Sequence, residues 1–356
     1  MTTETLSDAQ LEEIHVHATQ LAKQAGQMLL DAVEARSGSS AGAGHVEKES
    51  AVDLVTQTDE AALNNAHVII VVHLLIELLC FPLDVEAFIR QSVQAKFPSH
   101  AFVGEESYSK GQFKEYLIPA KGPSWCIDPL DGTVNFIHLA PFYCVSIAFL
   151  WDGEPVVGAV NAPFLRQLFT ACRGKGAWLN ENTPLPHARN PIPPMPETAP
   201  KGCVFSCEWG KDRRDIPDGN MHRKVSSFMN MAAELGGRQG KGGMVHGVRS
   251  LGSATLDLCY VAMGGFDIWW EGGCWEWDVA AGVCILKEAG GLITTANPPE
   301  DYLNAAVPEA KLGSRLYLAI RPAGNSTSET GRQSQERTVR EVWRRVESLD
   351  YTRPGV

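Results

Sequence analysis

Apolar residues recur at helical spacing near the start of the chain. They fall every three or four positions at Leu11, Ile14, Ala18, Leu21 and Ala25. This spacing is typical of a helix with one buried face, and Ser7 with Gln10 is a candidate capping box in front of it. The pattern predicts an amphipathic opening helix, followed at 37–45 by a Gly- and Ser-rich stretch that is typical of a flexible linker.

Farther along, short apolar runs of strand length alternate with helical patterns. The predicted strands cover 101–103, 125–127, 142–151, 155–162, 167–171 and 203–207. The predicted helices cover 220–235, 253–263, 277–289 and 328–348, and the many charges of the last one favour a solvent-facing helix. Prolines between 182 and 200 are too dense for a helix or a central strand, which indicates a surface loop. The mixture predicts an α/β fold with helices packed on mixed sheets.

The segment Ala61–Leu83 is much more apolar than its surroundings. Its uninterrupted apolar part is shorter than the roughly 20 residues that a membrane span needs, and His73 and Glu77 lie within it. We therefore expect no membrane-spanning helix and no membrane partner. The N-terminal sequence also lacks the basic region, apolar stretch and cleavage site of a secretory signal, which predicts a cytoplasmic protein.

The composition is that of an ordinary globular protein, with 44% hydrophobic and 21% charged residues among 356. Lys and Arg number 31 against 42 Asp and Glu, so the formal net charge is −11 at pH 7. Because no basic face is evident in this acidic chain, we do not expect it to bind nucleic acid. Nine cysteines are scattered without a C-x-x-C pair, which favours reduced thiols over a zinc or redox centre.

Two aspartates follow the apolar run at 125–127. Asp128 and Asp131 are three residues apart, and Gly132 comes directly after them. A tight turn there would let both carboxylates and the Leu130 carbonyl converge, and clustered oxygens are the ligands of hard divalent cations. A D-x-x-D-G motif by itself is more typical of a structural turn, so other acids have to support a metal site.

Three further acids stand at comparable places. Glu105 follows the predicted strand at 101–103, Asp278 lies at the start of the predicted helix at 277–289, and Asp59 ends a short polar run. Helix N-termini favour acidic residues, so each of these acids by itself is a cap or turn candidate. Their joint occurrence is what points to a common site.

The acids belong to five blocks that occur in the order of a known signature. The blocks are VDLVTQTD (52–59), FVGEES (102–107), WCIDPLDGTVNF (125–136), VHGVRSLGSA (245–254) and WEWDVAAGVCILKEAGG (275–291). Together they resemble the inositol monophosphatase family of Mg²⁺-dependent, lithium-sensitive phosphatases. Residues 207–214 and 266–282 more narrowly resemble a fungal branch encoded with quinate-utilisation genes.

The resemblance implies a layered αβαβα sandwich of the inositol monophosphatase and fructose-1,6-bisphosphatase type. It also implies one catalytic domain over 1–325, a charged C-terminal helix and tail over 326–356, and a homodimer. The implied Mg²⁺ ligands are Glu105, Asp128, the Leu130 carbonyl, Asp131 and Asp278, with Asp128 shared between two ions and Glu105 also helping to hold a weaker third one.

The resemblance further implies residues for water activation and for substrate binding. Asp59 and Thr133 would orient and deprotonate the attacking water, in a reaction without a covalent phospho-enzyme. The implied substrate contacts are Asp131, Gly132, Thr133, Gly252, Ser253, Ala254 and Glu271. Because a phosphate monoester brings about two negative charges, interposed Mg²⁺ ions would let an acidic protein bind it and would act as Lewis acids.

Two departures from the family pattern bear on the site. Residues 210–214 read GKDRR where the family carries Gly-Ser, which is compatible with a more anionic substrate or with a solvated charged turn. The apolar segment Ala61–Leu83 interrupts the pattern directly after Glu60, and its 23 residues can be removed without changing the reading frame. Removal joins Glu60 to Asp84 and restores the family's helix, so we interpret the segment as a retained intron, with a genuine inserted helix as the alternative.

The sequence therefore predicts hydrolysis of a small phosphate ester, with inositol monophosphate as the preferred substrate. The alternatives of the same class are 3′-phosphoadenosine 5′-phosphate and histidinol phosphate. A different class, a catalytically silent regulator of quinate metabolism, also stays open because of the quinate-cluster resemblance and the interruption beside Asp59.

Overall fold

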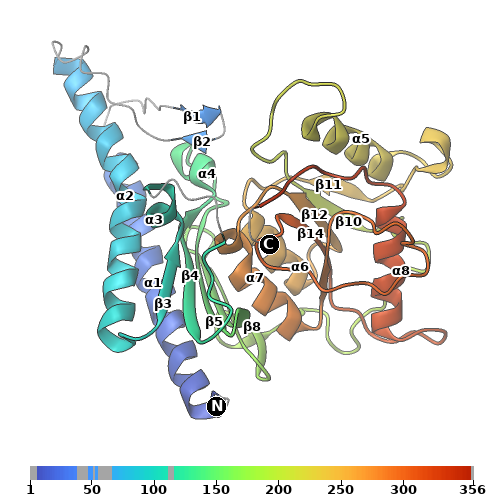
Figure 1. The fold of residues 1–356 in the computed structure, drawn as a ribbon, viewed down its shortest axis with the longest axis horizontal. Coiled ribbons are helices and arrows are strands. Elements are labelled where there is room, and N and C mark those ends of the chain that lie inside the picture. Colours follow the sequence, from blue (N-terminus) through green and yellow to red (C-terminus); the bar gives the residue numbers. More distant parts are fainter. Residues whose placement is uncertain (1–5, 38–46, 51–52, 55–65, 111–115, 354–356) are drawn as a thin grey trace.

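The structure is a computed structural model that describes residues 6–37, 47–50, 53–54, 66–110 and 116–353. Two sheets and the helices beside and between them form five layers (Figure 1). The seven-stranded sheet has the order β3-β4-β5-β6-β7-β8-β9, and the five-stranded sheet has the order β11-β10-β12-β14-β13. The predicted αβαβα sandwich is thereby confirmed.

Two long antiparallel helices, α1 (Asp8–Ser37) and α2 (Ala66–Lys96), cover the outer face of the larger sheet (Figure 1). The predicted capping box is present, since Ser7 N donates to Gln10 Oε1 at 2.9 Å and Gln10 N donates to Ser7 Oγ at 3.3 Å. Only Ser37 of the predicted linker 37–45 is among the described residues. A separate two-stranded sheet pairs β1 (Glu47–Ser50) with β2 (Asp53–Leu54).

The larger sheet is mostly antiparallel, and two of its strands end at predicted site residues. Its members are β3 (Ala101–Gly104), β4 (Pro123–Asp131), β5 (Cys144–Trp151), β6 (Glu154–Ala162), β7 (Gln167–Cys172), β8 (Gly176–Leu179) and β9 (Thr183–Pro184). Short helices follow the first two strands, α3 (Glu105–Lys110) after β3 and α4 (Thr133–Ile137) after β4. Glu105 and Asp131 therefore both lie where a strand ends.

The middle layer consists of α6 (Ala254–Met263) and α7 (Glu276–Ala289), packed between the two sheets (Figure 1). The approach of α7 to β6 is so close that a Cβ atom on Gly158 would lie 2.5 Å from the Ala281 carbonyl oxygen. Glycine is therefore required at that position. The contact fixes α7, and with it Asp278, against the larger sheet.

The five-stranded sheet and two outer helices complete the sandwich. The strands are β10 (Val204–Cys207), β11 (Gly247–Arg249), β12 (Ile268–Gly272), β13 (Leu292–Thr294) and β14 (Leu316–Ile320), and the outer helices are α5 (Asn220–Ala232) and α8 (Gly331–Trp343). The sequence reading missed all of these strands except β10. The expected solvent exposure of 328–348 holds for only one face of α8, because Val339, Val342 and Trp343 are buried in the core.

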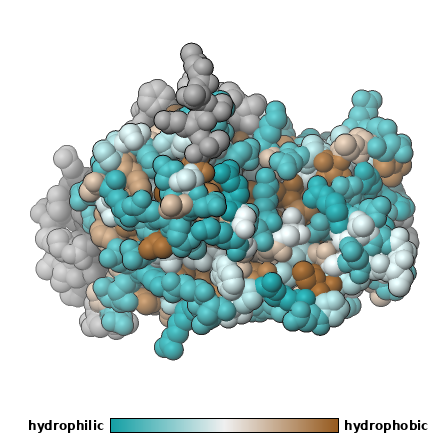
Figure 2. All heavy atoms as spheres, turned by 90° about the horizontal axis from the view of Figure 1, so that it is seen from below, coloured by the Kyte–Doolittle hydropathy of each residue, from teal (hydrophilic) through white to brown (hydrophobic). Residues whose placement is uncertain are grey.

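The described residues of Ala61–Leu83 form the first part of α2, which runs without interruption from Ala66 through Pro82 to Lys96. None of the helices in the described part of the chain is long and apolar enough to cross a membrane. The described free cysteines, from Cys126 to Cys284, are all buried. On the face drawn in Figure 2, hydrophobic residues gather in small separate groups among hydrophilic ones.

Candidate metal centre

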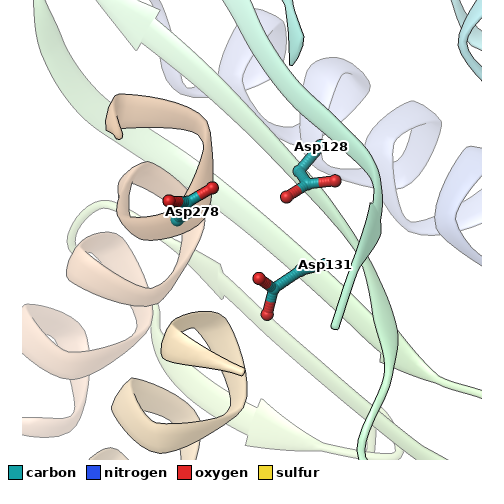
Figure 3. A group of neighbouring side chains, drawn as sticks. All are labelled: Asp128, Asp131 and Asp278. Carbon is teal, nitrogen blue, oxygen red and sulfur yellow. The ribbon is translucent and has the colours of Figure 1, made fainter. Parts of the chain in front are cut away.

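Three carboxylates converge between the larger sheet and the middle layer. Asp128 and Asp131 come from the end of β4, Asp278 comes from the first turn of α7, and their side chains point toward one another (Figure 3). One oxygen from each lies within 4.8 Å of the others. The structure thus brings together three of the predicted metal ligands.

A bulge in β4 explains how two aspartates three residues apart share one face. Asp128 pairs with Ser146 of β5 and Asp131 pairs with Cys144, so the register between the two strands shifts in this interval. In a regular strand residues i and i+3 point to opposite faces, and one extra residue turns them to the same face. The turn is fixed by the Leu130 N–H, which donates to Asp128 Oδ1 at 2.9 Å.

The carboxylates of the cluster lack a compensating charge in direct contact among the described residues, and their electrostatics reflect this. Burial, followed by the charges of Glu105 and of the other aspartates, raises the pKa of Asp128 well above its usual range. Burial raises the pKa of Asp131 to about 6, although hydrogen bonds from Ser253 and Thr255 oppose the rise. Burial, Asp131 and Glu105 likewise raise the pKa of Asp278. Clustered, buried oxygen donors of this kind fit a divalent cation such as Mg²⁺.

Glu105, the first residue of α3, is held near the cluster by a residue that the sequence analysis did not single out. The buried Glu86 carboxylate of α2 accepts the backbone N–H of Glu106 at 2.8 Å and that of Ser107 at 3.1 Å. Gly104 makes room for it, because a Cβ atom there would lie 2.3 Å from Glu86 Oε2. Glu86 therefore caps α3 and positions Glu105, although it gives no local sequence signal.

Thr133 begins α4 next to the predicted carbonyl ligand. Its hydroxyl donates to the Leu130 carbonyl oxygen at 3.1 Å. Gly132 before it has φ +83, and a Cβ atom there would lie 2.5 Å from the Phe142 carbonyl oxygen, so only glycine suits the turn. Asp59, the predicted partner of Thr133, lies outside the described residues, and their pairing stays a prediction.

The segment Gly252–Ala254 enters α6 beside the carboxylates. Ser253 is the N-cap of α6 and accepts the Leu256 N–H at 3.1 Å, and its hydroxyl also donates to Asp131 Oδ2. Ser253 therefore joins the N-terminus of α6 to a predicted metal ligand. Since helix N-termini attract anions, the segment lies where a phosphate beside the metal ligands could be bound.

The Glu208 carboxylate supports this segment, and a second carboxylate, Glu271, pairs with a buried lysine. Glu208 accepts the N–H groups of Leu251 at 2.6 Å and Gly252 at 2.9 Å. Glu271, predicted to contact substrate, is only 2% exposed and pairs with Lys224 Nζ at 2.6 Å. Burial raises the pKa of Glu271 to about 7, although Lys224 opposes the rise. The sequence analysis did not identify Lys224, and the substrate contact of Glu271 stays a prediction.

The charged loop at 210–214 lies close enough to Asp278 for the charge of Lys211 to act on it. Asp212 accepts from Arg214 Nε at 2.8 Å, and this bond lowers the pKa of Asp212 to about 2. Lys211 is exposed, and its charge partly offsets the rise in the pKa of Asp278. The charge of Lys211 thus acts on a predicted metal ligand.

Comparisons with known proteins agree with this geometry. The sequence profile of the inositol monophosphatase family matches residues 82–347. The chain is 59% identical over 366 aligned positions to quinic acid degradation cluster protein x of Neurospora crassa, with 100% of both chains covered. It is 38% identical over 269 positions to inositol monophosphatase 2 of Saccharomyces cerevisiae, covering 75% of this chain and 82% of the yeast protein. The solved inositol monophosphatase from Anabaena (Nostoc) sp. PCC 7120 matches with a TM-score of 0.61 and 25% identity, covering 96% of this chain and 98% of that one. The chain therefore belongs to the inositol monophosphatase family.

Proposed function

We propose that this protein is a Mg²⁺-dependent phosphatase that hydrolyses inositol monophosphate to inositol and inorganic phosphate. The observation that carries the proposal is the convergence of Asp128, Asp131 and Asp278, with one oxygen from each within 4.8 Å of the others. The charge of Glu105 acts on all three of them. Such a constellation has no evident purpose in a protein that binds no cation, since crowded buried carboxylates repel one another.

Each predicted residue has a defined task in this proposal. Glu105, Asp128 and the Leu130 carbonyl would hold one Mg²⁺, and Asp128, Asp131 and Asp278 would hold a second. When bound, the ions supply Lewis-acid stabilisation and lower the pKa of a coordinated water. Asp131, Gly132, Thr133 and Glu271 orient the substrate, and the backbone at Gly252, Ser253 and Ala254 binds its phosphate oxygens. Water displaces the inositol oxygen from phosphorus, and the leaving oxygen takes up a proton.

Asp59 is the proposed base for this water, and its position relative to Thr133 depends on whether Ala61–Leu83 is present in the protein. The ring of Phe81 in α2 stacks on Phe136 of α4 with centroids 6.0 Å apart, and α4 begins at Thr133. In a chain without the segment, Asp59 would take the helical position now held by Pro82, one turn before Glu86. This contact between α2 and α4 supports the hypothesis of a retained intron, because the shortened chain would bring Asp59 toward Thr133. The family profile also begins its match at Pro82.

One experiment tests the activity and the segment together. Phosphate release from inositol 1-phosphate is measured with and without Mg²⁺, for the chain as written and for a chain lacking Ala61–Leu83. Asp128→Asn serves as the inactive control, since it removes the ligand shared by both ions. Activity in both chains would establish the phosphatase and make the segment a tolerated insertion, whereas activity only in the shortened chain would support a retained intron. Sequencing the transcript checks the intron directly.

Silence in both chains would turn attention to the alternatives, provided that both fold and bind Mg²⁺. The same assay with 3′-phosphoadenosine 5′-phosphate and with histidinol phosphate tests the related substrates. A regulatory role without catalysis is the second candidate function, and the 59% identity to a protein named for the quinic acid degradation cluster leaves it open. Absence of turnover on all three esters would support that role.

A further inference from the structure

The C-terminal tail contacts both helices that carry the predicted ligands Glu105 and Asp278, which are α3 and α7. After α8 the chain runs back to the middle of the molecule, beside the start of α7 (Figure 1). There the Arg353 guanidinium forms an ion pair with Glu276, and the two side chains are 1% and 0% exposed. Glu276 is the first residue of α7, two positions before Asp278. The tail thus places a buried cation next to a ligand-bearing helix.

Aromatic rings from two different elements surround this cation. Arg353 Cζ lies 4.6 Å from the ring centroid of Trp275 and 5.3 Å from that of Tyr108. Trp275 precedes α7, and its backbone N–H donates to Asp278 Oδ2 at 2.6 Å. Tyr108 belongs to α3, three residues after Glu105, and its ring lies 5.0 Å from that of Trp277. A guanidinium over aromatic faces is attracted to each of them, so Arg353 joins α3 to α7.

The remainder of the tail clamps the chain that leads into α7. The ring of Tyr351 packs so closely that a Cβ atom on Gly273 would lie 2.9 Å from it. Arg315, just before β14, contacts the same stretch of chain before α7. Its guanidinium lies 3.9 Å from the ring centroid of Trp275 and donates to the Gly273 carbonyl oxygen at 2.8 Å. The start of α7 is therefore held between Arg315 and the tail.

We propose that Arg353 is a positioning residue of the metal centre, which sets the separation of Glu105 on α3 and Asp278 on α7. The six-residue helix α3 is held at its first turn by Glu86 of α2. Farther along α3, Tyr108 contacts Arg353. Both ligands are acidic and repel each other, so a fixed separation has to be imposed by surrounding groups. The proposal rests on the proposed metal site and is independent of which phosphate ester is hydrolysed.

The test is the binding of Mg²⁺ alone, by calorimetry, to the metal-free full chain. Arg353→Met is compared with Arg332→Met, in which an exposed arginine of α8 that pairs with Glu336 is replaced. We expect the dissociation constant for Mg²⁺ to rise about tenfold in Arg353→Met, as for other residues that support metal ligands, and to stay unchanged in Arg332→Met. Unchanged Mg²⁺ affinity in a folded Arg353→Met chain would overturn the proposal.

A double variant separates positioning from general stability. Arg353→Met leaves the Glu276 carboxylate buried without its partner, which destabilises the protein, whereas Arg353→Met with Glu276→Gln removes both charges. We expect the double variant to recover thermal stability while its Mg²⁺ affinity stays weak. If the affinity recovers together with the stability, Arg353 has only a structural role and the proposal fails. Should Arg353→Met not fold, the double variant and Arg353→Lys are compared in the same way.

The calorimetric measurement also keeps this proposal distinct from the proposed function. If the chain as written and the chain lacking Ala61–Leu83 both bind Mg²⁺ but release no phosphate, the proposed activity is contradicted and the test of Arg353 stays intact. A folded parent chain that does not bind Mg²⁺ would overturn both.

Discussion

Asp278, on the α7 side of the proposed metal centre, is held by hydrogen bonds from several elements, whereas the backbone directly after Glu105, on the α2 side, is held by hydrogen bonds to one carboxylate. The Asp278 backbone carbonyl accepts from Thr255 Oγ1 of α6 at 2.7 Å, and the neighbouring Trp277 carbonyl accepts from Ser146 Oγ of β5 at 3.1 Å. On the other side, α3 is capped by Glu86 of α2. The α2 side therefore depends on the register of a single helix.

This difference locates the weak point of the site. The aspartates of β4 and α7 are held by the core of the sandwich and, at the start of α7, by the contacts of Arg353. The described part of Ala61–Leu83, which interrupts the family pattern, also belongs to α2. If the segment impairs catalysis, the loss should therefore appear in water activation before it appears in metal binding.

The largest expected effect comes from Asp59→Asn made in two backgrounds. In the chain lacking Ala61–Leu83 we expect kcat on inositol 1-phosphate to fall about 100-fold, since small misplacements of a catalytic group already cost that much. In the chain as written we expect little change, because the inserted residues separate Asp59 from the α2 position beside α4. Steady-state kinetics provide the measurement, and equal losses in both backgrounds would contradict this view of the α2 side.

A second prediction concerns pH and the charge of the cluster. The pKa of Asp131 in the folded, metal-free chain is about 6 against an ordinary 3.8. Because the pKa of Asp131 is higher in the folded than in the unfolded chain, its contribution to stability is fully present at a pH below the unfolded pKa of 3.8. This contribution is lost as the pH rises through about 6. Mg²⁺ needs the ionised form, so its affinity weakens as the pH falls below 6, by up to about tenfold per unit for each proton displaced.

Unfolding by urea at pH 5, 6 and 7, with and without Mg²⁺, checks this prediction. The difference in unfolding free energy between the two series should grow from pH 5 to pH 7. Histidines with lowered pKa values, such as His15, whose pKa burial depresses, contribute to both series alike. A difference that is constant with pH would contradict the placement of Mg²⁺ among these carboxylates.

A third prediction addresses the support of Glu105. Glu86→Gln removes the negative charge that caps α3, and we expect Mg²⁺ to bind about tenfold more weakly. Glu181→Gln is the matched control, since Glu181 lies between β8 and β9 and forms an exposed ion pair with Lys23 at 2.5 Å. Calorimetry gives the affinities. Equal Mg²⁺ affinity in both variants would show that α3 does not need Glu86.

The smallest expected effect is on substrate preference. Lys211→Ser removes the cation whose charge acts on Asp278, and an exposed charge contributes roughly 1 kcal/mol or less to an ionic contact. We expect kcat/KM for a substrate with a second anionic group to fall no more than about fivefold relative to inositol 1-phosphate. Lys121→Ser, at an exposed ion pair with Asp152, is the control. An unchanged ratio would favour the solvated-turn interpretation of 210–214.

Much of this site follows from local sequence patterns. The apolar run before Glu105 correctly predicted that this acid follows a strand, and the start of α7 was predicted within one residue. The strand predicted at 125–127 instead continues through Asp128 to Asp131. The shared face of Asp128 and Asp131 was less accessible, because a bulge in β4 changes the alternation and leaves no mark in the residue types. Strands of three to five residues, such as β13 and β14, are too short to show a period.

The residues that the sequence did not reveal act through distant partners. Lys224 and Glu271 are 47 positions apart, and Glu86 caps N–H groups 20 and 21 positions away. The fold brings each pair together, and neither member has neighbours that indicate the pairing. The continuation of α2 through Pro82 could not be predicted from local sequence either, because proline by itself is expected to break a helix.

The ion pair between Arg353 and Glu276 also has a consequence for the order of events during synthesis. Its two members are 77 positions apart, and all of the proposed carboxylate ligands precede Arg353 in the chain. A ribosome therefore completes the set of acids well before it adds the arginine that neutralises Glu276. A translation product that stops between Asp278 and Arg353 carries every proposed metal ligand and lacks the partner of the Glu276 carboxylate at the start of α7.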